Sequence, residues 1–143
     1  MEIKKVGVVG MGTMGSQIGI VCARGGFQTI MVDLSETFIK KGFSAIRSFL
    51  NNQVNKGKMT REEMDKILSL ISTTTDLTKA LSDVELTIEA VFEDIDVKKE
   101  LFKKMDGICQ KETILGSNTS TLSITEMGAV TSRPEKCIGI HFL

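Results

Sequence analysis

The stretch "VGVVGMGTMGSQ" constrains the fold of this chain more than any other part of its sequence. Gly10, Gly12 and Gly15 come directly after the β-branched run at residues 3–9, which predicts a strand buried on both faces. A helical pattern follows, formed by Met14, Ile18, Val21 and Cys22. A G-x-G-x-x-G pattern is weak evidence alone, but between a strand and a helix it is typical of a turn that binds a dinucleotide.

Each glycine has a distinct expected role in such a turn. Gly10 permits the tight turn, Gly12 lets the backbone approach a pyrophosphate, and Gly15 allows helix and strand to pack closely. The free N–H groups and the positive end of the helix dipole then face the phosphates. The candidate cofactor-binding residues in this loop are Gly10, Met11, Gly12, Thr13, Met14 and Gly15.

Asp33 closes the next predicted strand, at residues 27–33, and is a candidate for binding the adenosine ribose. A carboxylate at this position would repel a 2′-phosphate, and no arginine follows in "DLSETF" to compensate. NAD is therefore favoured over NADP. A flavin-binding fold, or a glycine-rich turn without a ligand, remains an alternative.

The rest of the chain alternates between helical and strand patterns. From Ser35 a helical stripe is formed by Ile39, Phe43, Ile46, Leu50 and Val54. Thr60 and Glu63 then form a predicted capping box. A short strand and helix are expected within residues 71–77, and later strands at residues 84–91, 113–119 and 137–143. This alternation predicts an α/β fold of the Rossmann type, with a doubly wound, mainly parallel sheet and a projecting helical hairpin over residues 35–71.

Composition limits the partners and the location. Lysine plus arginine balance aspartate plus glutamate at 18 each, so neither a nucleic acid nor an anionic membrane is expected as a partner. The three cysteines lack metal-ligand spacing, which favours reduced thiols and no metal site. With no leader or membrane-spanning pattern, we expect one cytoplasmic domain over residues 1–143.

Polar residues also follow the later predicted strands, where a parallel sheet binds its ligands. They are residues 90–93, the "SNTS" segment at 117–120, and His141, the only histidine. A neutral imidazole can take a proton from an alcohol while hydride leaves the same carbon, and a serine hydroxyl can hold the reacting oxygen. On spacing alone, a lone histidine in an apolar strand is more often a hydrogen-bonded core residue.

Four segments favour a catalytic role for His141 over a core role. They are "GMGTMGSQ", "TIEAVFEDIDVKKELF", "ETILGSNTSTLSITE" and "RPEKCIGIHFL". In this order and spacing, the chain resembles the N-terminal NAD-binding domain of the L-3-hydroxyacyl-CoA dehydrogenases, particularly the short-chain 3-hydroxybutyryl-CoA branch. The resemblance covers essentially the whole chain. "SNTS" followed by "G-x-H-F" is far more specific than the glycine pattern.

The resemblance implies NAD-dependent oxidation of a (3S)-3-hydroxyacyl-CoA to the 3-oxoacyl-CoA, in fatty-acid β-oxidation or butyrate metabolism. It assigns His141 as the general base, and Ser120 as the residue that contacts both the reacting oxygen and the cofactor. It places Ala90, Glu93 and Lys98 beside the nicotinamide ribose. For Glu93 and Lys98 the alternative is a solvated pair at a helix start.

The resemblance also matches the predicted hairpin to an arm over coenzyme A. Lys56 and Lys58 at its tip are therefore candidates for binding a phosphate of the substrate. A solvated turn is at least as good an explanation of these two lysines.

The chain departs from the family pattern at its C-terminal end. The family continues past His141 and Phe142 with an aromatic residue and Asn-Pro, where this chain has Leu143. The family also has a glutamate that orients the histidine, and a helical second domain that closes the substrate site and forms a homodimer. We therefore expect this chain to be the cofactor-binding part of a longer enzyme, which binds NAD(H) but turns over substrate poorly alone.

Two other functions remain open on the sequence. A non-catalytic NAD-binding module could keep the glycines while losing Ser120 and His141. A dehydrogenase of the 3-hydroxyisobutyrate or 6-phosphogluconate type has a similar glycine loop, but uses a catalytic lysine in a later helix and lacks "SNTS" followed by "HF".

Overall fold

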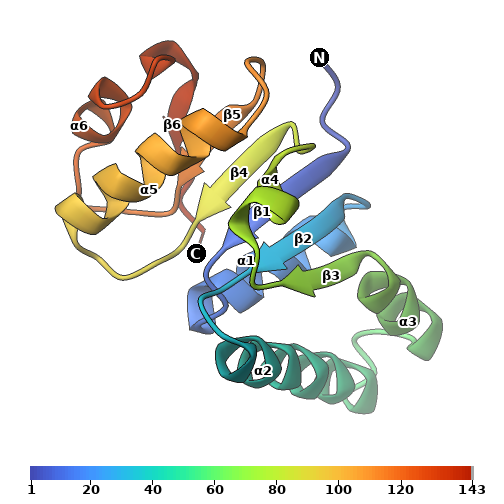
Figure 1. The fold of residues 1–143 in the computed structure, drawn as a ribbon. Coiled ribbons are helices and arrows are strands. Elements are labelled where there is room, and N and C mark those ends of the chain that lie inside the picture. Colours follow the sequence, from blue (N-terminus) through green and yellow to red (C-terminus); the bar gives the residue numbers. More distant parts are fainter. Residues whose placement is uncertain (143) are drawn as a thin grey trace.

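Six strands form one sheet through the centre of the molecule in the computed structural model, which describes residues 1–142 (Figure 1). The strands are β1 (Lys5–Val9), β2 (Gln28–Val32), β3 (Ile71–Thr74), β4 (Leu86–Glu89), β5 (Ile114–Ser117) and β6 (Cys137–Gly139). Every pairing is parallel, in the order β3-β2-β1-β4-β5-β6. The Rossmann-type prediction is confirmed, with a sheet that is wholly parallel. The order reverses between β1 and β4, where such sheets bind their ligands.

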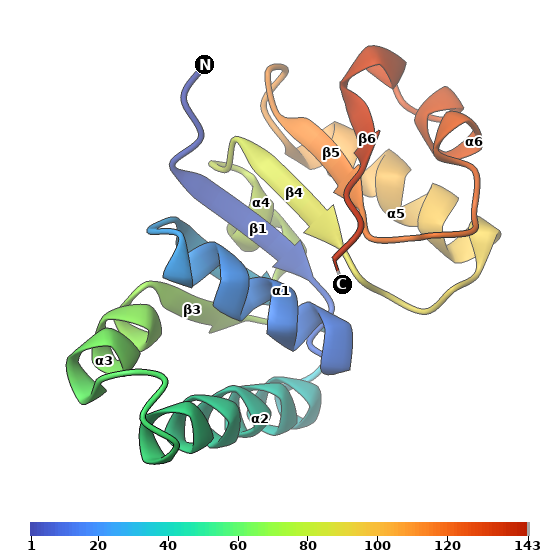
Figure 2. The ribbon, with the colours of Figure 1, turned by 180° about the vertical axis from the view of Figure 1, so that it is seen from behind.

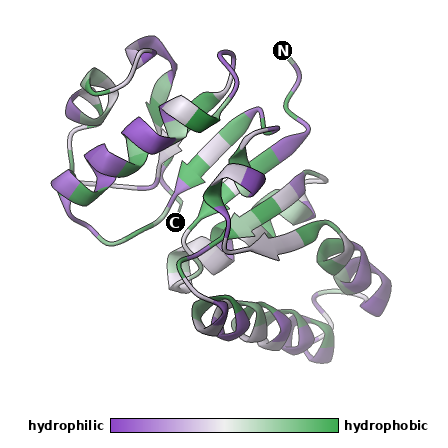
Figure 3. Cartoon of the chain, in the orientation of Figure 1, coloured by the Kyte–Doolittle hydropathy of each residue, from purple (hydrophilic) through white to green (hydrophobic). Residues whose placement is uncertain are grey.

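Helices cover both faces of this sheet. They are α1 (Thr13–Arg24), α2 (Glu36–Asn55), α3 (Arg61–Ser69), α4 (Leu77–Leu81), α5 (Ile95–Ile108), α6 (Ile124–Ala129) and the short 3-10 helix η1 (Pro134–Lys136). In Figures 1 and 2, α4 and α5 lie on one face and α1 on the other, with α2 and α3 below α1. The strands are mostly hydrophobic, and hydrophilic residues gather on the outer sides of α2, α3 and α5 (Figure 3).

Strand alternation divides the apolar core into two clusters, one on each face of the sheet. Val6 and Val8 of β1 belong to the cluster that includes residues of α1, α2 and α3. Val9, the next residue along, belongs to the cluster that includes residues of α4, α5 and α6. The same alternation along β4 directs Ile88 to the α1 side, and Thr87 and Glu89 to the α5 side.

The predicted hairpin corresponds to α2 and α3, and is less detached from the sheet than expected. Thr60 and Glu63 form the predicted capping box at the start of α3. However, Ile46 and Leu50 of α2 and Met64 of α3 are buried in the α1-side cluster. The hairpin therefore completes the core beyond the β3 edge, and only its turn lies at the periphery (Figure 2).

The final strand differs most from the prediction. A buried strand over residues 137–143 was expected, whereas β6 ends at Gly139 and its Ile138 is 46% exposed. The reason is position: β6 is an edge strand that pairs only with β5. His141 lies beyond the strand and is exposed. Leu143, where the family has an aromatic residue, lies outside the described residues.

The helical pattern predicted after the glycine turn corresponds to α1, but only part of it faces the core. Ile18 and Cys22 are buried, but Met14 and Val21 are 39% and 53% exposed. Among residues 1–142, none of the helices combines the length and the apolar character needed to cross a bilayer.

Candidate functional site

The three glycines of the loop between β1 and α1 have three different surroundings. Gly10 has a φ of 105°, a backbone conformation that favours glycine. A Cβ on Gly15 would overlap the carbonyl of Gly10, because α1 packs directly against the turn. A Cβ on Gly12 would meet nothing within 4 Å. The backbone at Gly12 is thus open to a ligand, as the pattern predicts.

The N-terminus of α1 is also open. No side chain caps it, and its first turn holds no acidic residue. By contrast, α2 through α6 are each capped by a side chain, from Ser35, Thr60, Asp76, Asp94 and Ser123 respectively. Free N–H groups and the positive end of the dipole at α1 suit a phosphate.

Asp33 lies beside this loop, just after β2. Its Oδ2 accepts a hydrogen bond from the backbone N–H of Met11 at 2.7 Å, and its Oδ1 accepts one from the N–H of Leu34 at 2.7 Å. The carboxylate therefore positions the glycine loop and retains further lone pairs for a ribose hydroxyl. Sequence reasoning predicted its place but missed its contact with Met11.

An open cavity of about 370 Å³ lies beside Asp33. Its lining residues are Met11, Gly12, Thr13, Ser16, Asp33, Phe38, Lys41, Gly42 and Ala45. Ser16, Phe38, Lys41, Gly42 and Ala45 were not predicted. A Cβ on Gly42 would come within 2.6 Å of the Met11 carbonyl oxygen, so a glycine there lets α2 close this side of the cavity. The cavity therefore lies between Asp33, the predicted ribose ligand, and the start of α1, the predicted pyrophosphate site.

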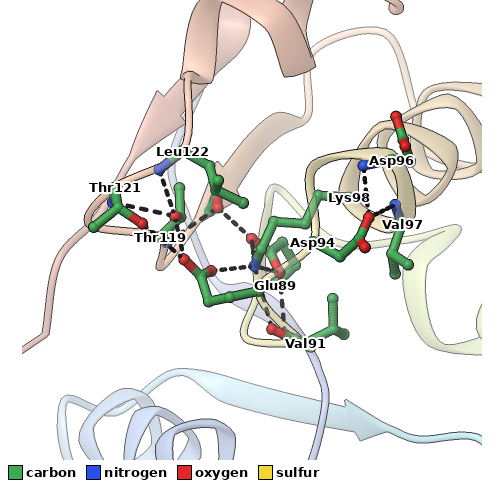
Figure 4. Close-up of polar contacts among 11 residues, drawn as sticks. Glu89, Val91, Asp94, Asp96, Val97, Lys98, Thr119, Thr121 and Leu122 are labelled. Carbon is green, nitrogen blue, oxygen red and sulfur yellow. Dashed lines mark hydrogen bonds and ion pairs between the residues drawn. The ribbon is translucent and has the colours of Figure 1, made fainter.

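A buried ionic cluster lies on the other side of the switch point, at the carboxyl ends of β4 and β5 (Figure 4). The Nζ of Lys98, on α5, lies 2.7 Å and 2.6 Å from the two carboxylate oxygens of Glu89. Both side chains are almost wholly buried, at 1% and 0% exposed. Ser117 of β5 and the backbone N–H of Val91 also donate hydrogen bonds to Glu89.

Glu93 forms the outer part of this cluster. Its Oε1 lies 3.0 Å from the Nζ of Lys98, and its Oε2 accepts hydrogen bonds from the hydroxyls of Thr119 at 2.8 Å and Thr121 at 3.3 Å. Burial raises the pKa of Glu93, but hydrogen bonds from Lys98 and the two threonines outweigh burial and lower the pKa from 4.5. Glu93 and Lys98 thus form an ion pair in which Lys98 is buried and Glu93 is half-exposed, so the alternative of a solvated pair holds for Glu93 alone.

Sequence reasoning missed Glu89, Ser117 and Thr119, which complete this cluster. Glu89 carried a signal that could have found it, since it is a carboxylate within the strand expected over residues 84–91. A buried carboxylate requires a partner. The partner is Lys98, and only the packing of α5 on the sheet brings it to Glu89.

Ala90 lies at the switch point itself. Its backbone N–H donates to the carbonyl of Val9 at 2.9 Å, and its carbonyl lies against Gly10. The residue therefore connects the glycine loop to the Glu89 cluster, between the two halves of the expected cofactor site.

Ser120 and His141 lie on neighbouring segments at the carboxyl edge of the sheet, and both are exposed. The side-chain oxygen of Asn118 accepts a hydrogen bond from the backbone N–H of Phe142 at 3.2 Å. This bond joins the loop that contains Ser120 to the segment that contains His141. In both ribbon views this last segment runs beside the carboxyl end of β4 (Figures 1 and 2).

Lys56 and Lys58 are not brought to this edge. Both are exposed in the turn between α2 and α3, at the far end of α2 from the glycine loop (Figure 2). Their contact with a substrate phosphate stays a prediction. Within residues 1–142, no group of three or more His, Cys, Asp or Glu side chains is placed to hold a metal ion.

Comparisons with known proteins show which family the chain belongs to. Residues 5–143 match the family "3-hydroxyacyl-CoA dehydrogenase, NAD binding domain". The chain is 41% identical to a probable 3-hydroxybutyryl-CoA dehydrogenase of Bacillus subtilis, covering 100% of this chain and 50% of that protein. It is 42% identical to the 3-hydroxybutyryl-CoA dehydrogenase of Mycobacterium tuberculosis, covering 98% of this chain and 49% of that protein.

A solved structure shows the same fold. The crystal structure of (S)-3-hydroxybutyryl-CoA dehydrogenase from Ralstonia eutropha superposes with a TM-score of 0.95 at 39% identity, covering 99% of this chain and 50% of that one. The chain thus spans about half the length of the curated relatives it matches. The resemblance inferred from the four segments is confirmed: the chain belongs to the NAD-binding domain family of the 3-hydroxyacyl-CoA dehydrogenases.

Proposed function

We propose that this chain is the cofactor-binding part of an enzyme that oxidises a short-chain (3S)-3-hydroxyacyl-CoA, such as 3-hydroxybutyryl-CoA, to the 3-oxoacyl-CoA. NAD, when bound, supplies the hydride acceptor. The observation that supports the proposal best is the Asn118–Phe142 hydrogen bond, because it couples the Ser120 loop to the His141 segment at one edge of the sheet. The names of the relatives favour a short acyl chain.

His141 is proposed to take the proton of the 3-hydroxyl group. The histidine is exposed at the carboxyl edge of the sheet, where a ligand can reach it. This position does not suit a hydrogen-bonded core histidine, the alternative left open by the sequence. A neutral imidazole accepts the proton while the C3–H electron pair leaves as hydride.

Ser120 is proposed to donate a hydrogen bond to the same oxygen and to contact the cofactor. The preceding residue, Thr119, is held by Glu93, and its own side chain accepts from the N–H of Leu122 at 3.1 Å. The backbone on both sides of Ser120 is thus fixed, which suits a positioning role.

The cofactor half-sites are proposed as follows. Residues of the glycine loop, Gly10 to Gly15, bind the pyrophosphate, and Asp33 binds the adenosine ribose. Ala90, Glu93 and Lys98 lie on the nicotinamide side. The fit rests on the open backbone at Gly12, the uncapped α1 and the cavity beside Asp33.

The relatives contain about as much chain again as this one. We therefore propose that a second domain shapes the acyl pocket and forms a homodimer, and that this chain alone turns over substrate poorly. A cytoplasmic location also stays a prediction.

Calorimetric titration of the chain with NADH tests the proposal, followed by addition of acetoacetyl-CoA. We expect NADH to bind, and Asp33→Ala to weaken binding by about tenfold or more, since the variant loses a charged hydrogen-bond acceptor. Asp83→Ala is the matched control, because Asp83 is exposed before β4 at the opposite end of the sheet.

Each outcome separates the alternatives. NADH binding without oxidation by acetoacetyl-CoA supports a cofactor domain that needs more chain for turnover. Turnover at the rate of a two-domain dehydrogenase would contradict that part of the proposal. Absence of NADH binding would overturn the cofactor assignment for this chain.

A further inference from the structure

The Glu89, Lys98 and Glu93 cluster contains one more carboxylate than it contains cations. Lys98 is the only cation within hydrogen-bond distance of Glu89 or Glu93 among residues 1–142. Every contact to the two carboxylates comes from a donor: Lys98, Ser117 and the Val91 N–H to Glu89, and Lys98, Thr119 and Thr121 to Glu93. All of these contacts are satisfied when Lys98 and both carboxylates are in their ordinary charged forms. The cluster therefore has a net charge of about −1.

Other charged groups nearby do not cancel this excess. Lys99 on α5 is directed to Glu126 of α6, with 3.5 Å between nitrogen and oxygen. Asp94 caps the N-terminus of α5, which is the positive end of its dipole. Its Oδ1 accepts hydrogen bonds from the N–H groups of Asp96 and Val97 at 2.9 and 3.1 Å. The excess charge thus stays at the carboxyl ends of β4 and β5.

Under the proposed function, the nicotinamide half of the cofactor would lie at this edge. The adenosine half would lie in the cavity beside Asp33, on the β2 side of the glycine loop. A dinucleotide that crosses the switch point then extends over β4 and β5. Glu93 is the member of the cluster nearest to solvent, with 50% of its side chain exposed. It also contacts the loop that contains Ser120.

We propose that the excess negative charge of the Glu89–Lys98–Glu93 cluster shifts the binding preference of the site toward the oxidised cofactor. The nicotinamide ring is positively charged in NAD⁺ and neutral in NADH, since it gains a hydride in the reaction. A carboxylate at a fixed distance attracts the first ring and not the second. The inference rests on the proposed function, because it requires the nicotinamide to lie at this edge.

The ratio of the two dissociation constants separates this role from a structural one. A variant that merely loosens the loop weakens NAD⁺ and NADH equally, and leaves Kd(NAD⁺)/Kd(NADH) unchanged. Loss of the charge weakens NAD⁺ relative to NADH. For a half-exposed group at short range, we expect Glu93→Gln to raise the ratio by about threefold to tenfold. For a two-electron couple this equals a shift of about 14 to 30 mV toward the reduced cofactor.

Calorimetric titration with NAD⁺ and with NADH, on the wild type and three variants, makes the test. Glu93→Gln keeps the shape and removes the charge, while Glu93→Asp keeps the charge and should leave the ratio within about twofold. Glu112→Gln makes the same charge change at the opposite end of β5, where the side chain is 74% exposed, and should also leave the ratio unchanged.

Equal weakening of NAD⁺ and NADH by Glu93→Gln would overturn the inference and leave the proposed function intact. The same change of ratio in Glu112→Gln would also overturn it, since the effect would then be one of total charge. If the wild-type chain binds neither form, the proposed function fails and this inference fails with it.

Discussion

Gly12 and Gly15 are three residues apart, yet a methyl group would have opposite consequences at the two positions. At Gly15 it would overlap the backbone of Gly10, and at Gly12 it would point into open space. Gly15 is therefore required by the fold. Gly12 is required only by what binds there.

This difference predicts two separable phenotypes. We expect Gly12→Ala to unfold within about 0.5 kcal/mol of the wild type, as surface substitutions do, while NADH binding weakens about tenfold or more. Gly15→Ala should lose about 1–3 kcal/mol, since the helix must move away from the turn. Urea unfolding and NADH titration on both variants make the comparison. Equal destabilisation by the two substitutions would contradict the assignment.

At the scale of single residues, the sequence predicted the members of the site that belong to local motifs. Gly10, Gly12, Gly15 and Asp33 lie within one strand-turn-helix-strand unit, so their spacing was sufficient. Glu89 was missed because its role depends on Lys98, which a different element brings to it. Lys41 and Gly42 were missed for the same reason, since α2 must fold over the glycine loop before they line the cavity.

At the scale of elements, the end of α5 depends on a residue far along the chain. Arg133 donates to the carbonyls of Asp106 and Cys109 at 3.0 and 3.3 Å, and to that of Thr113, before β5, at 3.1 Å. Its Nε also lies 2.7 Å from Oδ1 of Asp106. The Arg133 side chain thus fastens the last turn of α5 to the start of β5 and to the segment before β6.

Asp106 makes the stability of these Arg133 contacts depend on pH. Burial raises the pKa of Asp106, but hydrogen bonds from Ser132 and Arg133 outweigh burial and lower the pKa from 3.8. A carboxyl group with a lowered pKa in the folded state stabilises the protein above its unfolded pKa. That stabilisation is lost as the pH falls through the folded pKa.

We therefore expect Asp106→Asn to cost about 1–3 kcal/mol at pH 7, because a charged hydrogen-bond acceptor is lost. The difference from the wild type should shrink as the pH falls below about 4, where the wild-type carboxyl group also becomes protonated. Urea unfolding at pH 7 and at acid pH measures both values. Asp65→Asn, at an exposed position on α3, is the control. A difference that stays constant with pH would contradict the role of Asp106.

The elements also show where sequence patterns reach their limit. The alternation of strands and helices was predicted correctly, because each crossover is local in sequence. The length and burial of β6 were not, because an apolar run looks the same in a central strand and at an edge. Only the strand order shows that β6 has a single neighbour.

At the scale of the whole molecule, one sheet separates two apolar clusters. Cys22 lies in the cluster on the α1 side, and Cys109 in the cluster on the α5 side. Burial raises the pKa of each thiol to about 11. Both thiols are therefore protonated and shielded from reagents in the folded state. Alkylation of each thiol thus measures the unfolding of the cluster that contains it.

Because β1 and β2 contribute to both clusters, we expect the two sides to unfold together. In pulsed alkylation with iodoacetamide at increasing urea, followed by mass spectrometry, Cys22 and Cys109 should become reactive at the same urea concentration. If one thiol becomes reactive at a clearly lower concentration, the two faces are separate cooperative units.

The open end of α1 has a consequence for how this molecule is completed. Five helices are finished at their N-termini by the protein's own side chains, and α1 is not. A pyrophosphate bound at α1 would accept the hydrogen bonds that a serine or aspartate accepts elsewhere in the chain. In that state the bound cofactor acts as the N-cap of α1, a role that a side chain of the protein has in α2 through α6.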